Sequence, residues 1–98
     1  MPGTLEVHKA VVDPANAEAL VALRPRLIEA VREACPGFVG ATLVRLDERT
    51  WLDVVEWESA QAAADSREAE MALPEAQELM ALIDQPLWAE IGEIADRR

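Results

Sequence analysis

The chain contains one histidine, His8, and an imidazole is the side chain best suited to exchanging protons near neutral pH. His8 lies in a β-rich segment, where it could accept the proton of a phenol as a general base. Asp53 interrupts another apolar, strand-like segment, and a carboxylate in such a place needs a partner. Either His8 or Arg45 would serve, and an Asp53–His8 pair would raise the basicity of the imidazole. The alternative is that both are hydrogen-bonded or edge residues of a sheet without a catalytic role.

Aromatic, basic and sulfur-containing side chains form a second group of candidates, for binding a flat ligand. Trp57 and Trp88 offer π-faces for a planar molecule, although tryptophans in a small domain more often belong to the core. Arg67 could contact a ligand carboxylate or enolate, whereas its acidic neighbours indicate a solvated helix face. Met71 and Met80 could adapt a pocket to the shape of a ligand, and both also suit plain core filling.

Charge and composition argue against several classes of partner. Nineteen acidic residues against nine basic ones give a net charge of −10, and Lys9 is the only lysine. No cationic surface is therefore expected for nucleic acid or for an anionic membrane. A single cysteine, Cys35, and a single histidine are too few ligands for structural zinc, and the cysteine is expected to be a small buried side chain.

Length and hydropathy limit the architecture. With 98 residues, of which 51% are hydrophobic, the chain is long enough for one core, so we expect a single domain over residues 1–98. No apolar run approaches the roughly 20 residues that span a bilayer. The first residues lack a basic region followed by an apolar stretch, which predicts no secretion signal and a cytoplasmic location.

The first half of the chain predicts a strand over residues 5–12 and a helix that begins at Asp13-Pro14. Pro25 lies inside this helix, so we expect a kink or a short break near residues 21–24. Arg24 is assigned to the solvent side of the helix. The opposite, apolar side repeats at helical spacing, with Leu20, Leu23, Leu27, Ile28, Val31 and Cys35.

The second half continues with alternating elements. Pro36-Gly37 ends the helix, because proline cannot continue it and glycine tolerates a left-handed cap. Ser59 is the expected N-cap of a later helix. The predicted elements are strands at 38–46 and 51–57, helices at 59–70 and from 74 to about 83, and a last strand at 87–94.

This order predicts an α+β fold of the ferredoxin-like kind, β-α-β-β-α-β, with a four-stranded antiparallel sheet and helices on one face. Leu43, Leu52 and Val54 would then lie on the other face and expose a contiguous apolar patch, which soluble monomers rarely do. Pairing two sheets across a two-fold axis would cover it, so we expect a homodimer.

The chain resembles the antibiotic biosynthesis monooxygenase family over nearly its whole length. The resemblance is carried by Pro36-Gly37-Phe38, by the hairpin that ends in Val55-Glu-Trp57-Glu-Ser59, and by the helix that opens at Pro74. It implies a dimeric α/β barrel and, in members that are enzymes, oxygenation of an electron-rich aromatic such as a quinol or an anthrone. It also implies that no metal, flavin or other cofactor takes part, and it places His8 at a pocket-facing position.

Some members of the resembled family degrade heme with an Asn, a Trp and a His. By alignment those positions hold His8, Arg67 and Gln77 here, so the iron-ligating histidine is missing and heme degradation is not expected. The polyketide-oxidising branch uses a tyrosine in some members, and this chain has none.

Three functional hypotheses follow. The first is a cofactor-independent monooxygenase that acts on a small hydrophobic aromatic molecule. The second is a polyketide cyclase or isomerase of the same fold, in which His8 and Asp53 perform acid–base work only. The third is a small-molecule-binding or structural homodimer without catalysis.

Overall fold

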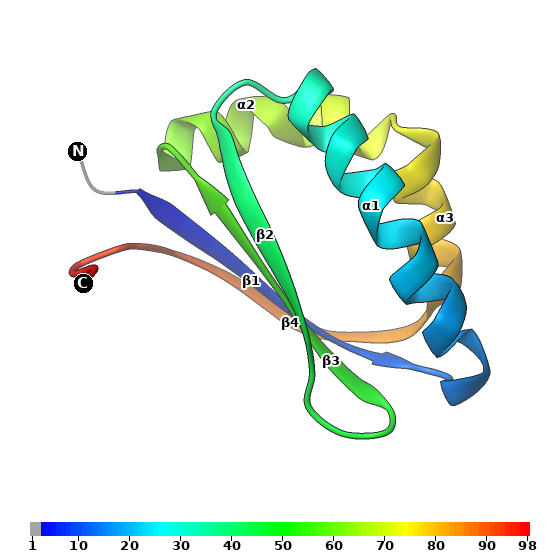
Figure 1. The fold of residues 1–98 in the computed structure, drawn as a ribbon. Coiled ribbons are helices and arrows are strands. Elements are labelled where there is room, and N and C mark those ends of the chain that lie inside the picture. Colours follow the sequence, from blue (N-terminus) through cyan, green and yellow to red (C-terminus); the bar gives the residue numbers. More distant parts are fainter. Residues whose placement is uncertain (1–2) are drawn as a thin grey trace.

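The computed structural model describes residues 3–98, which form four strands and three α-helices (Figure 1). A short 3₁₀ turn, Pro14–Asn16, precedes the first helix. The elements are β1 (Thr4–Val12), α1 (Ala17–Ala34), β2 (Phe38–Arg45), β3 (Thr50–Trp57), α2 (Ala60–Met71), α3 (Pro74–Leu82) and β4 (Ile83–Glu93).

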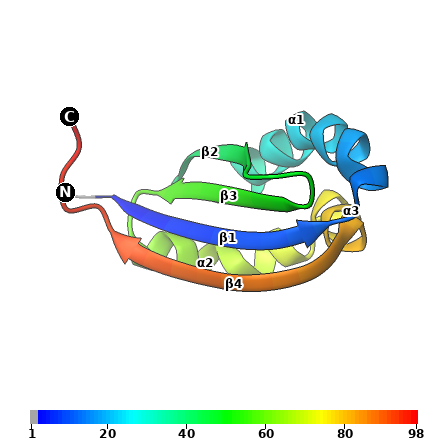
Figure 2. The same ribbon diagram turned by 90° about the horizontal axis from the view of Figure 1, so that it is seen from below.

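The strands form one antiparallel sheet in the order β2-β3-β1-β4. All three helices lie on the same side of it, and Figure 2 shows the other side uncovered. The predicted ferredoxin-like architecture is confirmed, with the second helical region divided into α2 and α3. The strand that was expected from residue 87 begins earlier, at Ile83, directly after α3.

Local signals end and start the elements around β2 as the sequence predicts. Gly37 has φ +90°, and a Cβ atom there would meet the Cβ of Ala62 at 2.6 Å, so glycine is required both for conformation and for space. Ser59 caps α2, where its side-chain oxygen accepts a hydrogen bond from the amide of Ala62 at 3.0 Å.

Of the kink or short break expected near residues 21–24, the break is absent, because α1 runs without interruption through Pro25. Proline removes one amide donor and crowds the carbonyl of Val21. Both Pro25 and Val21 are exposed, so water can bond that carbonyl while the buried face of the helix stays regular.

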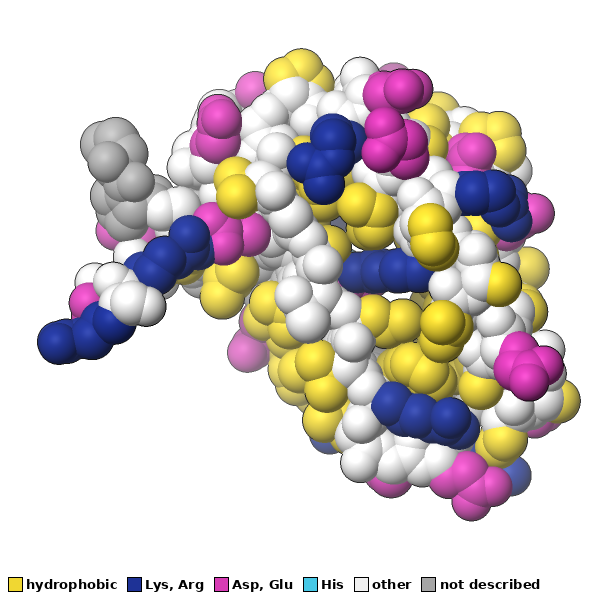
Figure 3. Space-filling view, viewed as in Figure 1, with side chains coloured by type: hydrophobic (Ala, Val, Ile, Leu, Met, Phe, Trp, Pro, Cys, Tyr) yellow, Lys and Arg dark blue, Asp and Glu magenta, His cyan; other side chains and the backbone are white. Residues whose placement is uncertain are grey.

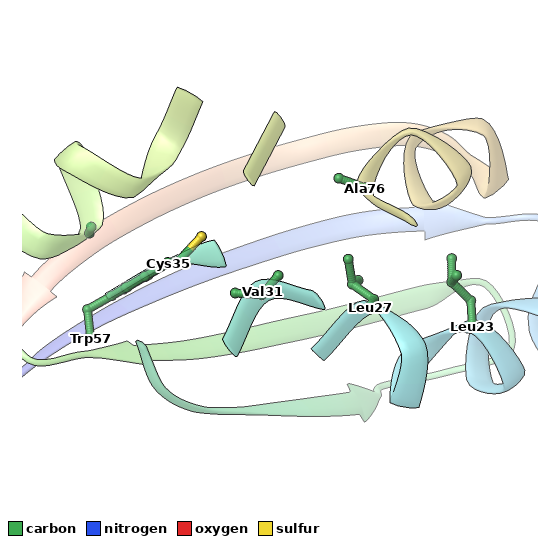
Figure 4. Packing of buried hydrophobic residues seen from close by; sticks show 7 residues of the cluster. Leu23, Leu27, Val31, Cys35, Trp57 and Ala76 are labelled. Carbon is green, nitrogen blue, oxygen red and sulfur yellow. The ribbon is translucent and has the colours of Figure 1, made fainter. Parts of the chain in front are cut away.

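The core lies between the helices and the covered face of the sheet, in two clusters. The larger one contains Trp57, which is 1% exposed and packs edge-to-face against Phe38 with ring centroids 5.7 Å apart. Figure 4 shows the residues of this cluster, with Leu23, Leu27 and Val31 contributed by α1. The smaller cluster is built from Val12, Ala17, Leu20 and Trp51.

A bulge in β2 places Leu43 on the opposite face of the sheet from the one that was predicted. The pairing of β2 with β3 shifts between Phe38 and Gly40, which inverts the side on which later residues of the strand lie. Leu43 therefore faces the helices and not the uncovered side, while Leu52 and Val54 lie on the uncovered side as expected.

Candidate functional site

A cavity of about 190 Å³ lies between the sheet and the helices. Figure 3 shows a hollow between α1 and β2 with hydrophobic side chains inside and basic side chains along it. The walls are mainly apolar, and five lining residues are ionisable. Those five are Glu6, His8, Arg24, Asp53 and Glu70.

Strand alternation brings His8 and Asp53 to the cavity. Side chains of a strand alternate between its two faces, so Glu6, His8 and Ala10 share the covered face of β1. Asp53 is the direct partner of His8 across β1 and β3, with Trp51 opposite Ala10. The structure therefore brings the two predicted catalytic residues together, as neighbours in one wall of the cavity.

His8 pairs with Glu6 rather than with Asp53. Its Nε2 lies 3.1 Å from Oε2 of Glu6, and the other carboxylate oxygen accepts a hydrogen bond from Trp57 Nε1 at 3.0 Å. The hydrogen bond that His8 donates to the Glu6 carboxylate raises the pKa of His8 above its usual 6.5, against the opposing effect of burial. The same bond lowers the pKa of Glu6. The pair thus forms a more basic imidazole held by a carboxylate.

Asp53 has a different partner from the two that the sequence suggested. Arg24 donates two hydrogen bonds to it, Nη1 to Oδ2 at 2.8 Å and Nη2 to Oδ1 at 2.6 Å. Both side chains are largely buried, 14% exposed for Arg24 and 21% for Asp53. Arg24 therefore lies in the cavity wall and not on the solvent side of α1, and the two-point contact fixes its guanidinium.

Glu70 adds a third carboxyl group to the cavity, from the last turn of α2. Burial raises its pKa, and the negative charges of Glu6 and Asp53 raise it further, while His8 and Arg67 oppose the shift. Glu70 consequently takes up a proton more readily than an exposed glutamate.

The residues predicted to bind substrate separate into two groups. Met71 and Met80 line the cavity. Trp57 is a core residue that reaches the site only through its hydrogen bond to Glu6. Arg67 is exposed on α2 and outside the cavity lining. Trp88 is paired with Lys9, and this register places it on the uncovered face of the sheet, away from the cavity. Its side chain is 45% exposed.

Glu6, Arg24 and Glu70 are the site residues that sequence reasoning missed. Two of them carried a usable signal: Glu6 is two residues before His8 and so on the same strand face, and Arg24 is four residues after Leu20 and three before Leu27 on the same helix face. Glu70 sits in an acidic helix, where nothing in the sequence separates it from its solvated neighbours.

Metal and membrane features are absent from the described part of the chain. Among residues 3–98, no three His, Cys, Asp or Glu side chains are grouped so as to hold a metal ion. No helix in the same range has the length and hydropathy to cross a membrane.

Comparison with known proteins gives a consistent result. The family model of antibiotic biosynthesis monooxygenases matches residues 5–78. Among solved structures, SnoaB, a cofactor-independent oxygenase from Streptomyces nogalater, is 25% identical, with a TM-score of 0.62 over 100% of this chain and 96% of that one. Rv0793 from Mycobacterium tuberculosis is 18% identical, with a TM-score of 0.68 over 97% of each chain.

A third structure is described as a dimeric ferredoxin-like protein from an uncultured marine organism. It is 12% identical, with a TM-score of 0.71 over 100% of this chain and 92% of that one, so the likeness concerns the fold. No curated protein matches the chain.

Proposed function

The chain belongs to the antibiotic biosynthesis monooxygenase family, and from this membership and the cavity we propose that it is a cofactor-independent monooxygenase of small, electron-rich aromatic molecules. One observation carries the proposal: the Glu6–His8 pair lies in the wall of an otherwise largely apolar cavity. An apolar pocket with a few convergent polar groups is the usual form of a small-molecule site. SnoaB, which the chain matches over 96% of SnoaB's length at 25% identity, is a cofactor-independent oxygenase.

The proposed reaction begins with a proton transfer to His8. The neutral imidazole takes the hydroxyl proton of the aromatic substrate, and the Glu6 carboxylate stabilises the imidazolium that forms. The resulting phenolate is electron-rich enough to react with dioxygen, and a C–O bond forms at a ring carbon that carries hydrogen. The peroxide then takes up a proton, the ring C–H proton is lost and the O–O bond breaks. One oxygen atom remains as a quinone carbonyl, the other leaves as water, and the substrate supplies all four electrons.

The volume of the cavity limits the size of the substrate. A volume of about 190 Å³ is below the roughly 300 to 1,000 Å³ of pockets that take drug-sized ligands. It favours a phenol or quinol of one or two rings over a three-ring anthrone. Met71 and Met80 at the cavity can change rotamer and adjust this limit.

The experiment measures dissolved oxygen during turnover. Purified, metal-free protein is mixed with 1-naphthol, with quinols and with anthrones, and the products are analysed by mass spectrometry under ¹⁸O₂. We expect one O₂ consumed and one labelled oxygen incorporated per quinone formed. His8→Ala should lower the rate about 100-fold or more, the usual loss for a general base. Arg26→Ala, which breaks an exposed ion pair with Glu78 outside the cavity, is the control and should not change the rate.

Either of two results would contradict the proposal. Uptake that His8→Ala leaves unchanged would remove His8 from the mechanism, and absence of uptake across the panel would remove the oxygenase assignment. The second candidate function, a cyclase or isomerase, is favoured by the grouping of Glu6, His8 and Glu70, which suits acid–base work without oxygen. It predicts deuterium exchange at an acidic C–H of the ligand under anaerobic conditions.

We further propose that the protein acts as a homodimer, through the uncovered face of the sheet. Val44 is 36% and Trp88 45% exposed, and Leu52 and Val54 lie on this face between them. A second copy would bury this apolar surface. Sedimentation equilibrium at micromolar concentration should give twice the mass of one chain, and Trp88→Lys should shift the equilibrium toward monomer. A monomeric wild-type protein would contradict the homodimer. A cytoplasmic location stays a prediction.

A further inference from the structure

Two side chains of the cavity wall, Trp51 and Arg24, carry N–H groups that bond to no other residue of the described chain. Trp51 is 7% exposed and lines the cavity, and its indole Nε1 is buried with no hydrogen-bond partner among residues 3–98. A buried donor without an acceptor costs about 1–3 kcal/mol, so such groups usually have a partner. A bound ligand that brings an oxygen atom to this N–H would supply it.

Arg24 offers further donors at the same place. A guanidinium carries five N–H groups, and Asp53 uses one on each Nη. The outer edge of the group, formed by Nε–H and the neighbouring Nη–H, has no acceptor recorded within residues 3–98. This edge is a second fork of the geometry that binds carboxylates, and Asp53 holds it in a fixed orientation.

The two groups are neighbours because of the strand. Trp51 and Asp53 are two residues apart on the same face of β3, and both line the cavity with Arg24, so the guanidinium that Asp53 holds and the Trp51 indole belong to the same wall. The carboxyl groups of Glu6 and Glu70 are grouped with His8, further along the sheet. Like-charge repulsion from these two would direct an anionic group of a ligand toward Arg24 and Trp51.

Basic side chains near the opening of the cavity also favour an anionic ligand. Besides Arg24, Arg32 lies over the ring of Phe38 at 5.2 Å and Arg45 over the ring of Trp51 at 5.0 Å, and both rings line the cavity. A third of the nine basic residues thus flank one cavity in a chain of net charge −10. Figure 3 shows basic side chains along this opening between α1 and β2. Such a local concentration attracts anions.

We propose that Arg24 and Trp51 form an oxyanion site that binds the carboxylate of a small aromatic acid, so that the substrate is a hydroxylated aromatic acid of one or two rings. The acid would enter between α1 and β2, and its ring would lie beside His8, since Asp53 and His8 are direct strand partners. As a statement about the substrate this rests on the proposed function. As a statement about binding it stands on the unused donors.

Isothermal titration with 2-naphthoate and its neutral analogue 2-naphthamide tests the site, because the two probes share ring and shape and differ in charge. Wild-type protein should bind the carboxylate about tenfold more tightly, as expected for one charge-assisted contact. Arg24→Gln should bring the two dissociation constants together. Arg26→Gln makes the same charge change on the same helix, where Arg26 pairs with Glu78 outside the cavity, and should keep the preference.

A second variant protects the test against misfolding of Arg24→Gln. Trp51→Phe removes the unpartnered N–H together with the five-membered part of the indole, so it should weaken binding of 2-naphthoate about fivefold and that of 2-naphthamide less, while thermal unfolding checks that the variant still folds. Sodium chloride should weaken binding of the carboxylate to wild-type protein and leave that of the amide unchanged.

The outcomes separate the inference from the proposed function. Equal affinities of the two probes, a preference that survives Arg24→Gln, an unaltered affinity in Trp51→Phe, or no binding of either probe overturns the oxyanion site. If oxygen uptake is nevertheless found, the monooxygenase assignment stands without it. A carboxylate preference that depends on Arg24, in a protein that consumes no oxygen with any hydroxylated naphthoate, keeps the site and rejects the oxygenase.

Discussion

Two ion pairs in the cavity wall differ in what they connect. Arg24–Asp53 joins helix α1 to strand β3 through two short hydrogen bonds, and both side chains are at least 79% buried, from exposures of 14% and 21%. Glu6–His8 joins two residues of one strand through a single contact of 3.1 Å, and the His8 side chain is 45% exposed. The first pair therefore ties two layers of the fold together, whereas the second can change its protonation without moving any element.

This difference assigns different tasks to the two pairs. A guanidinium does not lose its proton at any ordinary pH, so Arg24 is suited to binding and orienting an anion. An imidazole with a carboxylate partner is suited to moving a proton. The site thus separates the binding of charge from the transfer of protons, along adjacent positions of β1 and β3.

The largest effect on stability is expected from Arg24→Met. Removing the arginine leaves the carboxylate of Asp53 partly buried without its partner, which should lower the free energy of unfolding by about 2 kcal/mol, less than for a fully buried pair. Arg26→Met breaks an exposed pair on the same helix, 61% and 54% exposed, and should change it by less than about 0.5 kcal/mol. Urea unfolding measures both variants. Equal losses would show that the Arg24–Asp53 pair is no more than a surface contact.

The sequence contained much of this arrangement in local signals. Alternation along a strand is enough to predict that His8 and Asp53 share faces with their second neighbours, and Gly37 and Ser59 mark element ends through their own backbone chemistry. The partner of Asp53 could not be found in this way. Arg24 is 29 residues away in sequence, and which side chain of α1 reaches β3 depends on how the helix is rotated over the sheet.

The prediction of the sheet face on which Leu43 lies was wrong for a related reason. Strand alternation places a residue correctly only while the register is unbroken, and the bulge after Phe38 shifts it by one residue. Gly40 lies at that bulge, and an isolated glycine in a strand suggests one, but it does not give the residue at which the register shifts. Sites that depend on pairing between distant segments, such as the neighbourhood of Leu43 and Asp53, are therefore the part that a single sequence leaves undetermined.

The next largest effect concerns the Glu6–His8 pair and depends on pH. Glu6→Gln can still accept the hydrogen bond of Trp57 but removes the charge beside the imidazole. The pKa of His8, raised in the wild type, should fall back toward 6.5, and because His8 is the only histidine, one NMR resonance reports it. In the proposed reaction the rate rises as neutral His8 forms, so its pH midpoint should fall together with that pKa.

The sign of the stability change follows from the two shifts. The raised pKa of His8 stabilises the native state below about 6.5, and this is lost as pH rises through the folded value. The lowered pKa of Glu6 stabilises it above about 4.5, and this is lost as pH falls through the folded value. Glu6→Gln should therefore destabilise most between pH 4.5 and 6.5, by less than about 1 kcal/mol because His8 is partly exposed. Thermal unfolding at pH 5.5 and 9 with an equal loss at both would contradict the pairing.

The smallest effect should have the opposite sign. Burial raises the pKa of Glu70, so its ionised form is less stable in the folded protein than in the unfolded chain. The native state accordingly loses stability as pH rises above 4.5, the ordinary value, until the raised folded pKa is passed. Glu70→Gln removes that loss and should raise the free energy of unfolding at pH 8 by up to about 1 kcal/mol, with no gain at pH 4. Glu68→Gln, on the exposed side of α2, is the control. A destabilised Glu70→Gln at pH 8 would mean that the carboxylate of Glu70 has a partner that holds it ionised, and that this partner outweighs the burial that raises the pKa of Glu70.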